Sequence, residues 1–266
     1  QLGGTYRFES FNKTATRGGP LVKQPEEYSI NFSSYTDSRE RIIVEAYTGY
    51  SKTKLGGSYY SLSVDILWRP NTQINVSIGP QFERSNNPYQ WGGNFSDPTA
   101  VNTFGARYMF ARIEQKTLSA NIRLNWTFTP KLSLQLFFQP LFAVGKYNDF
   151  KELARPRTTN TNEYGKNGST ISFDASADAY NVDPDGNGPA QPFQISNPNF
   201  NFKSLRGNVV LRWEMLPGSI LYFAWSHNQT NFQNPGDFNL SRDFKNLWET
   251  GGDDVFLVKF SYWFDI

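Results

Sequence analysis

Oxygen-bearing side chains gather between residues 183 and 188 in a spacing that suits a calcium ion. Asp183, Asp185 and Asn187 stand at alternate positions before Gly188, like the first, third and fifth ligands and the glycine of a calcium loop. The twelfth position of such a loop is a bidentate Glu, whereas here it is Gln194. The segment therefore predicts either a loose Ca²⁺ loop held by these three side chains or an ordinary turn. No other cofactor is indicated.

Residues for catalysis are sparse. His227 is the single histidine, and its alternation in phase with Trp225 predicts an interfacial position at the outer rim of a membrane protein. No local motif supplies the nucleophile and orienting group that a Ser-His mechanism needs. Glu26 and Glu27 are neighbours in sequence, so on a strand they point to opposite faces and fail as a glycosidase pair. We expect no enzymatic activity.

The elements that position these residues are strands with a side-chain period of two. Apolar side chains alternate with polar ones almost without error from Thr117 to Phe142, and the pattern resumes after Thr129-Pro130. This pattern predicts a hairpin with one apolar and one polar face, each strand about 12 residues long. Strands in soluble proteins average about 5 to 6 residues, whereas a tilted strand needs about 9 to 11 to cross a bilayer. Strand length therefore favours a membrane protein.

Composition agrees with this interpretation. The chain has 266 residues, no Cys, a formal net charge of +2 and a mean hydropathy of -0.57. Aromatic residues make up 17% of the chain, and an aromatic excess on a polar average is typical of alternating strands with aromatic girdles. The absence of Cys excludes disulfides and thiolate sites, and the near-neutral charge gives no footprint for nucleic acid. A large soluble antiparallel barrel or sandwich is the alternative.

We expect about twelve strands in a single transmembrane domain spanning residues 1–266. The predicted ranges are 2–11, 27–36, 39–50, 57–69, 72–84, 89–95, 101–113, 117–128, 131–144, 201–214, 218–230 and 254–265. The short strand at 89–95 places all tight turns on one rim, including Asp97-Pro98-Thr99. Longer connections then face outward, and 145–200 is long enough to cap or plug the barrel. Both termini fall on the periplasmic side.

Charged side chains of the polar parity are expected to line the lumen. A charge facing lipid near the midplane costs about 2 to 4 kcal/mol for Arg or Lys, so alternation directs such residues inward. They form either a mutually satisfied ladder or a solute-selective pore. The lumen-facing set comprises Asp65, Arg107, Arg123, Arg206, Arg212, Glu214 and Lys259.

Closure of the barrel stays open at this level. Twelve strands can close, since even-numbered barrels begin at eight, but strands before Gln1 or from another chain are an equal alternative. The chain starts at Gln1 without an initiator Met or a signal sequence. Because an outer-membrane protein must be exported, we expect the chain to be processed or partial.

Several longer stretches in combination resemble one family. They are Phe11–Leu21, Arg107–Arg112, Leu118–Pro130, Asp149–Arg157, Phe200–Glu214, Pro217–Ser219 and Val255–Trp263. The chain is similar to the C-terminal barrel of Gram-negative outer-membrane proteins of unknown function that carry an N-terminal carbohydrate-binding module of the family-nine type. The resemblance implies that the glycan-binding module and further strands precede this region, which would be the C-terminal part of a larger barrel. The aromatic terminal strand is similar to the signal that the barrel-assembly machinery reads.

Three functional hypotheses follow. The first is a non-enzymatic barrel in the bacterial outer membrane that anchors or cooperates with a carbohydrate-binding module in polysaccharide handling. The second is a channel or a subunit of a larger outer-membrane transport or secretion complex. The third, suggested only by the resemblance, is a glycoside hydrolase-associated protein. Expected partners are outer-membrane lipid and lipopolysaccharide, the assembly machinery, glycans and other outer-membrane subunits.

Overall fold

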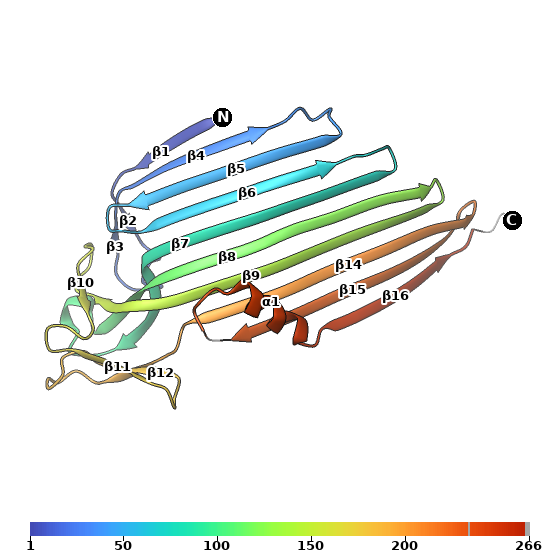
Figure 1. Ribbon diagram of the computed structural model, residues 1–266. Helices are drawn as coiled ribbons and strands as arrows, with labels where there is room; N and C mark the ends of the chain where they lie inside the picture. Colours follow the sequence, from blue (N-terminus) through green and yellow to red (C-terminus); the bar gives the residue numbers. More distant parts are fainter. Residues whose placement is uncertain (234, 264–266) are drawn as a thin grey trace.

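One large antiparallel sheet forms most of the molecule. The computed structural model describes residues 1–233 and 235–263. Within them the sheet has 11 strands, of which β10 pairs only with β9 and the others follow the order β1-β4-β5-β6-β7-β8-β9-β14-β15-β16 (Figure 1). This order confirms the all-β antiparallel class. No helix in the described part of the chain is long and apolar enough to cross a membrane.

The strands lengthen toward the middle of the sheet, from nine residues in β4 to 24 in β8. Their bounds are β1 Leu2–Arg7, β4 Glu27–Tyr35, β5 Ile42–Thr53, β6 Ser58–Trp68, β7 Ile74–Ser96, β8 Ala106–Thr129, β9 Leu132–Leu153, β10 Thr161–Glu163, β14 Phe200–Leu216, β15 Ser219–Gln233 and β16 Asp253–Ser261.

Smaller elements occupy the connections. Strands β2 (Ser10–Asn12) and β3 (Val22–Gln24) form a two-stranded ribbon. A separate three-stranded sheet contains β11 (Thr170–Asp174), β12 (Ala179–Asp183) and β13 (Phe193–Ser196). A 3₁₀ turn, η1 (Val101–Thr103), links β7 to β8, and α1 (Leu240–Glu249) links β15 to β16.

Several of the predicted boundaries are wrong. The expected strand 2–11 is divided into β1 and β2, which belong to different sheets. The expected strands 72–84 and 89–95 form the single strand β7, and 101–113 and 117–128 are joined in β8. Asn87 and Pro88, which lie between the ranges 72–84 and 89–95, stand at a register shift between Asn87 and Gln90 inside a continuing strand. A bulge explains why Pro is tolerated there. Asp97-Pro98-Thr99 consequently lies at the opposite rim from Thr129-Pro130.

The connections define two rims. We call the one with the short connections 36–41, 69–73, 130–131 and 217–218 the turn rim, and the other the loop rim. The first residue lies toward the turn rim, where the amino group of Gln1 donates to the Ser33 carbonyl at 2.7 Å. Near the other end, the Trp263 amide donates to Ser219 Oγ at 3.3 Å beside the 217–218 turn. The predicted outward residue Phe264 lies outside the described residues.

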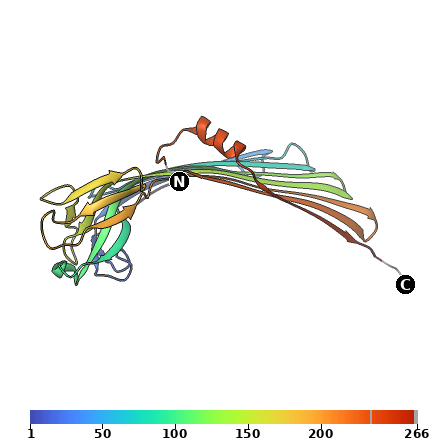
Figure 2. The same cartoon turned by 90° about the horizontal axis from the view of Figure 1, so that it is seen from below.

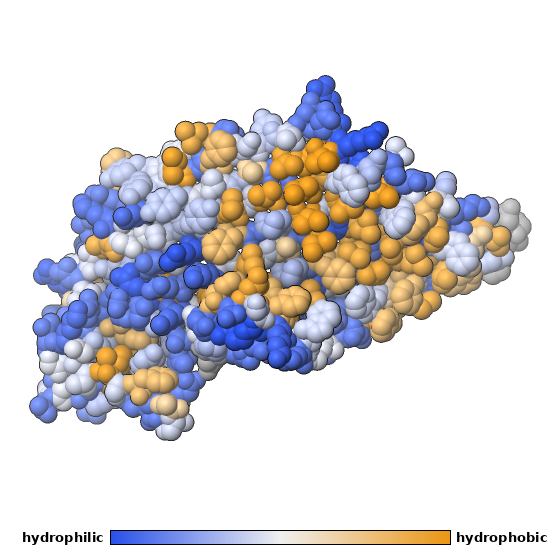
Figure 3. Space-filling model, in the orientation of Figure 1, coloured by the Kyte–Doolittle hydropathy of each residue, from blue (hydrophilic) through white to orange (hydrophobic). Residues whose placement is uncertain are grey.

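The two faces of the sheet differ in chemistry, as the alternation predicts. Ile66, Ile78 and Ile122 stand side by side in register on three neighbouring strands, and directly opposite residues share a face. We call this side the apolar face and the reverse side the polar face. Figure 3 shows the apolar surface spread over the strands toward the turn rim, with hydrophilic surface at the loop rim.

The loop rim carries material on both sides of the sheet. Helix α1 lies over the apolar face near β14 and β15, whereas η1 and the β2–β3 ribbon lie on the other side (Figure 2). The small sheet β11–β13 packs beyond the ends of β7 to β9 (Figure 1). The predicted long loop starts later than expected, because β9 continues to Leu153 before the chain turns into β10.

Both edges of the large sheet are open. Among the described residues β1 pairs only with β4, and β16 pairs only with β15. Backbone groups on these edges lack strand partners, which costs several kcal/mol for each unsatisfied group in hydrocarbon.

Candidate functional site

The polar face brings together six of the seven residues predicted to line the lumen. Arg212 stands opposite Tyr222, which stands opposite Lys259, and Arg212 donates to Glu214 at 3.2 Å. The other members reach the same face through the register of their strands. They are Asp65 on β6, Arg123 on β8 and Arg206 on β14.

The unpaired charges on the strands of the polar face are largely separated by sign, although Asp253 of β16 is an acidic residue on the basic side. Glu45 and Asp65 stand opposite each other on β5 and β6, whereas Arg123, Arg206 and Lys259 lie on the β8 to β16 side. None of these five forms an ion pair within the described chain. The guanidinium of Arg123 lies 5.1 Å from the centre of the Phe137 ring instead. Across the sheet the polar face therefore changes from acidic to basic.

A cavity of about 370 Å³ opens on the polar face near the loop rim. Glu27, Ser51, Tyr59 and Asn87 line its floor from four neighbouring strands, and the segment around β3 covers it. Arg7 crosses one end and donates to Glu27 at 2.5 Å. Hydroxyl, amide and carboxylate groups beside an aromatic ring can bind a polar, hydroxyl-rich ligand.

Arg107, the seventh predicted lumen residue, lies elsewhere. Its guanidinium is buried between β8 and β9 beyond the polar face, where it donates to Asp97 at 2.5 Å and to Glu152 at 2.7 Å. Tyr164 donates its hydroxyl to the same Glu152 at 3.1 Å. Near Arg107 the register of β8 shifts against both of its neighbours, against β7 between Asn87 and Gln90 and between Trp91 and Gly93, and against β9 between Phe110 and Arg112. The regular pairing that defines the polar face therefore does not extend to Arg107.

Burial and hydrogen bonding together shift the pKa values of this cluster. Burial alone would raise the pKa of Asp97, but hydrogen bonds from Thr99 and Arg107 outweigh it and hold that pKa below its ordinary value. Burial, reinforced by the Glu152 carboxylate, raises the pKa of Tyr164 far above its usual range. The cluster is consequently a charged carboxylate-guanidinium pair beside a neutral phenol.

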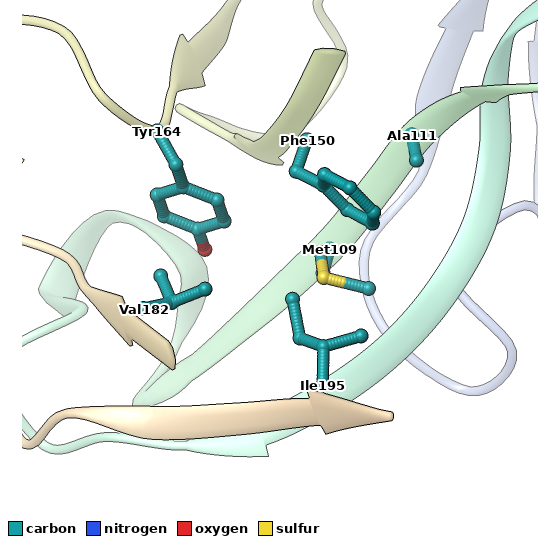
Figure 4. Packing of buried hydrophobic residues seen from close by; sticks show 6 residues of the cluster. All are labelled: Met109, Ala111, Phe150, Tyr164, Val182 and Ile195. Atoms are coloured by element: carbon teal, nitrogen blue, oxygen red, sulfur yellow. The ribbon is translucent and has the colours of Figure 1, made fainter. Parts of the chain in front are cut away.

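An apolar cluster fastens the 154–199 segment to the long strands. Met109 and Ala111 of β8 meet Phe150 of β9, while Val182 and Ile195 approach from β12 and β13 (Figure 4). Tyr164 lies at the edge of this cluster, so its ring packs with the apolar groups while its hydroxyl reaches Glu152.

The predicted calcium ligands lie in the connection after β12. Asp183 Oδ1 accepts the amides of Asp185 and Gly186, and Asp185 Oδ2 accepts the amide of Ala190 at 3.0 Å. Asn187 is exposed. Three or more His, Cys, Asp or Glu side chains that could jointly hold a metal ion do not occur within residues 1–233 and 235–263.

His227 has both ring nitrogens engaged. Nδ1 lies 2.9 Å from Asp254, which also accepts the indole N–H of Trp225, and Nε2 lies 3.3 Å from Gln229. No serine hydroxyl contacts the ring in the described residues. All four side chains share the apolar side of β15 and β16.

Two features escaped the sequence interpretation. The Asp97–Arg107–Glu152 cluster joins residues 10 and 45 positions apart, for which no local pattern exists. Helix α1 was read as part of a loop, although Asn239 before it is a favourable N-cap residue and accepts the Arg242 amide at 3.1 Å. That cap, followed by apolar residues at helical spacing, was the available signal.

Comparisons with known proteins give a family but no activity. A family model described as a domain of unknown function (DUF5916) matches residues 5–266. No curated protein matches the chain.

Among solved structures the chain is similar to the copper transporter OprC, with 11% identity and a TM-score of 0.46 over 97% of this chain and 36% of that one. It is similar to the alcaligin outer-membrane receptor FauA from Bordetella pertussis, with 9% identity and a TM-score of 0.37 over 98% and 40%. For the CymD monoaromatic hydrocarbon channel the values are 9%, 0.25, 90% and 87%. The chain spans less than half the length of the first two proteins.

Proposed function

The chain belongs to the DUF5916 family of domains of unknown function, and from its two faces we propose that it is a non-enzymatic wall of an outer-membrane β-barrel that cooperates with a carbohydrate-binding module in handling polysaccharide. The observation that carries the proposal is the pairing of an apolar face with a polar face that holds a cavity lined by Glu27, Ser51, Tyr59 and Asn87. An apolar exterior suits lipid, and a polar interior suits a hydrated solute.

Location is tested by single-cysteine labelling, which is clean because the chain has no Cys. The proposal places the loop rim outside the cell, so Asn187→Cys should react with a membrane-impermeant maleimide on intact cells. Asn71→Cys, at the turn rim, should react only after the outer membrane is permeabilised. Equal labelling of both variants on intact cells would contradict the proposed location.

The polysaccharide role is tested by glycan-array binding of the full-length protein in detergent. Tyr59→Ala removes the aromatic floor of the cavity and is expected to weaken binding by about tenfold, as loss of one stacked ring costs about 1 kcal/mol or more. Tyr47→Ala is the matched control, because Tyr47 shares the polar face but lies outside the cavity. Equal effects in the two variants would place the glycan elsewhere.

The open edges support a sector of a larger barrel over a closed barrel of these strands alone. A closed barrel would bring β1 and β16 together as neighbouring strands. Cysteine pairs placed along the two edges of the full-length protein, beginning with Gly4→Cys and Val258→Cys, would then include at least one pair that forms a disulfide. We expect no cross-link between any pair of edge positions. A disulfide formed in high yield would show closure by this chain itself.

A channel or transport subunit is the second candidate, favoured by the change from acidic to basic charge across the polar face. A transverse field of this kind orients polar solutes in a pore. Stable conductance steps in planar bilayers would support it, and Arg123→Glu with Arg206→Glu would then change ion selectivity. A silent bilayer with inserted protein would favour the first proposal.

A further inference from the structure

Three exposed cations lie on the apolar side of the sheet near the loop rim. Arg84 and Lys116 stand directly opposite each other in register on β7 and β8, and Lys146 follows on β9, opposite Glu114. Like charges placed opposite each other destabilise a strand pair. Arg84, Lys116 and Lys146 form no ion pair within the described chain, so their charges are not neutralised by direct contact with a carboxylate.

These cations surround a hollow of about 340 Å³ that the connection before α1 covers from one side. Lys116, Lys146 and Phe238 line it, together with two acidic groups, Glu114 and Asp237. Asp237 pairs with Arg242 at 2.9 Å, whereas Glu114 accepts only the neutral side-chain amide of Asn148 at 3.4 Å and keeps its charge. Three cations therefore face one uncompensated carboxylate, which leaves the hollow with a net positive charge for an external anion.

Helix α1 adds an apolar surface beside the hollow. Leu240, Phe244 and Trp248 lie one turn apart on its outward side, and Trp248 is 70% exposed although its ring stacks on that of Phe244. The helix cannot turn this stripe inward, since Asp243 is fully buried and accepts the Asn201 side-chain amide at 3.0 Å. An aromatic stripe held beside basic residues is typical of helices that lie in a membrane interface.

We propose that this surface binds the phosphate groups of an anionic lipid in the outer leaflet. Arg84, Lys116 and Lys146 contact the phosphates, and the Leu240–Phe244–Trp248 stripe lies at the boundary between headgroups and acyl chains. The surface continues directly into the apolar face, which places both parts at one membrane depth. The inference rests on the proposed outer-membrane location.

The test uses the full-length protein in nanodiscs of phosphatidylcholine with or without lipid A, with lipid A retention per protein as the readout. Arg84→Gln/Lys116→Gln/Lys146→Gln is expected to lower lipid A affinity by roughly a hundredfold. The matched control, Arg123→Gln/Arg206→Gln/Lys259→Gln, removes the same charge from the polar face and should leave affinity unchanged. The single variant Lys116→Glu provides a milder change should the triple variant misfold.

The outcomes separate the inference from the function beneath it. Equal lipid A affinity of the wild-type chain and the Arg84→Gln/Lys116→Gln/Lys146→Gln variant would overturn the lipid site. Complete displacement of lipid A by millimolar inorganic phosphate would also overturn it, because the cations would then bind the free ion. Protein that enters neither kind of nanodisc, judged by protection of β5 to β9 from protease, would instead contradict the outer-membrane location. Phe244→Ser with Trp248→Ser is expected to weaken retention several-fold without changing displacement by phosphate.

Discussion

Nη1 of Arg107 donates to both carboxylate oxygens of Glu152 at 2.7 Å, across a separation of 45 residues in the sequence. The same guanidinium reaches Asp97 through Nε. Because all three groups are buried, the attraction acts with little screening, and loss of one partner leaves the others without compensation. One side chain thus ties the connection between β7 and η1 to β8 and β9 at the loop rim.

Arg107→Met should release this corner. Removing one member of a buried ion cluster costs about 3 to 5 kcal/mol, so we expect faster hydrogen exchange and faster proteolysis within residues 154–199, with the central strands unchanged. Arg112→Met is the control, since its partner Asp149 is half exposed and such pairs contribute about 0 to 1 kcal/mol. The same exchange pattern in both variants would contradict a special role for Arg107.

The corner should also loosen at both extremes of pH. The lowered pKa of Asp97 means that its stabilisation is present above the ordinary carboxyl value of about 3.9 and is lost as the pH falls below it. The raised pKa of Tyr164 means that its contribution is present below about pH 10 and is lost at higher pH. The protection factors of amides in β12 and β13, which correct for the intrinsic pH dependence of exchange, should therefore be largest between these limits. Loss of protection near pH 6 would contradict the assignment.

Met109→Ala should destabilise the packing in Figure 4. Met109 is 1% exposed, and truncating a buried methionine costs about 2 to 5 kcal/mol through lost contacts and the cavity left behind. The chain contains one other methionine, Met215, which is 36% exposed at the turn rim. Met215→Ala should change the free energy of unfolding, measured by denaturant titration, by about 0.5 kcal/mol or less. A larger loss there than at Met109 would refute the prediction.

Chelation should leave the thermal midpoint unchanged. Asp183 and Asp185 spend carboxylate oxygens on closing their own loop through backbone amides, so the loop needs no ion to hold its shape. Differential scanning calorimetry with EDTA, Ca²⁺ and Mg²⁺ checks this. A midpoint that falls with EDTA, recovers with Ca²⁺ alone and is insensitive to Ca²⁺ in Asp185→Asn would place calcium at the Asp185 Oδ1 atom. This atom is buried and has no hydrogen-bond partner among the described residues.

The sequence predicts the faces of this fold better than its boundaries. The Thr129-Pro130 turn and the strands on either side are confirmed, because a strict period of two assigns every side chain once one is assigned. The continuity of β7 through Asn87 and Pro88 could not be predicted in the same way. Turn and bulge use the same residues, and only the partner strand distinguishes them.

The candidate site divides along the same line. Asp65, Arg123 and Arg206 reach the polar face through alternation alone. Arg107 obeys the same rule in sequence, but it lies past the points where the register of β8 shifts against β7 and against β9. Its partners, Asp97 and Glu152, come close to it only because of the path of the long connections. That path depends on tertiary packing, which no local sequence pattern encodes.

The unequal strands give the loop rim a slope. Ser58 at the start of β6 stands level with Asn86, Glu114 and Lys146. Beyond this level β7 continues to Ser96, β8 to Ala106 and β9 to Leu153, which is about 23 to 33 Å at roughly 3.3 Å per residue. A bulky molecule that approaches the loop rim therefore meets the long strands β7 to β9 on one side and the short strands β4 to β6 on the other. The long strands block approach from their side, so the molecule reaches the polar face over the short strands β4 to β6. These strands carry Glu27, Ser51 and Tyr59, which line the cavity.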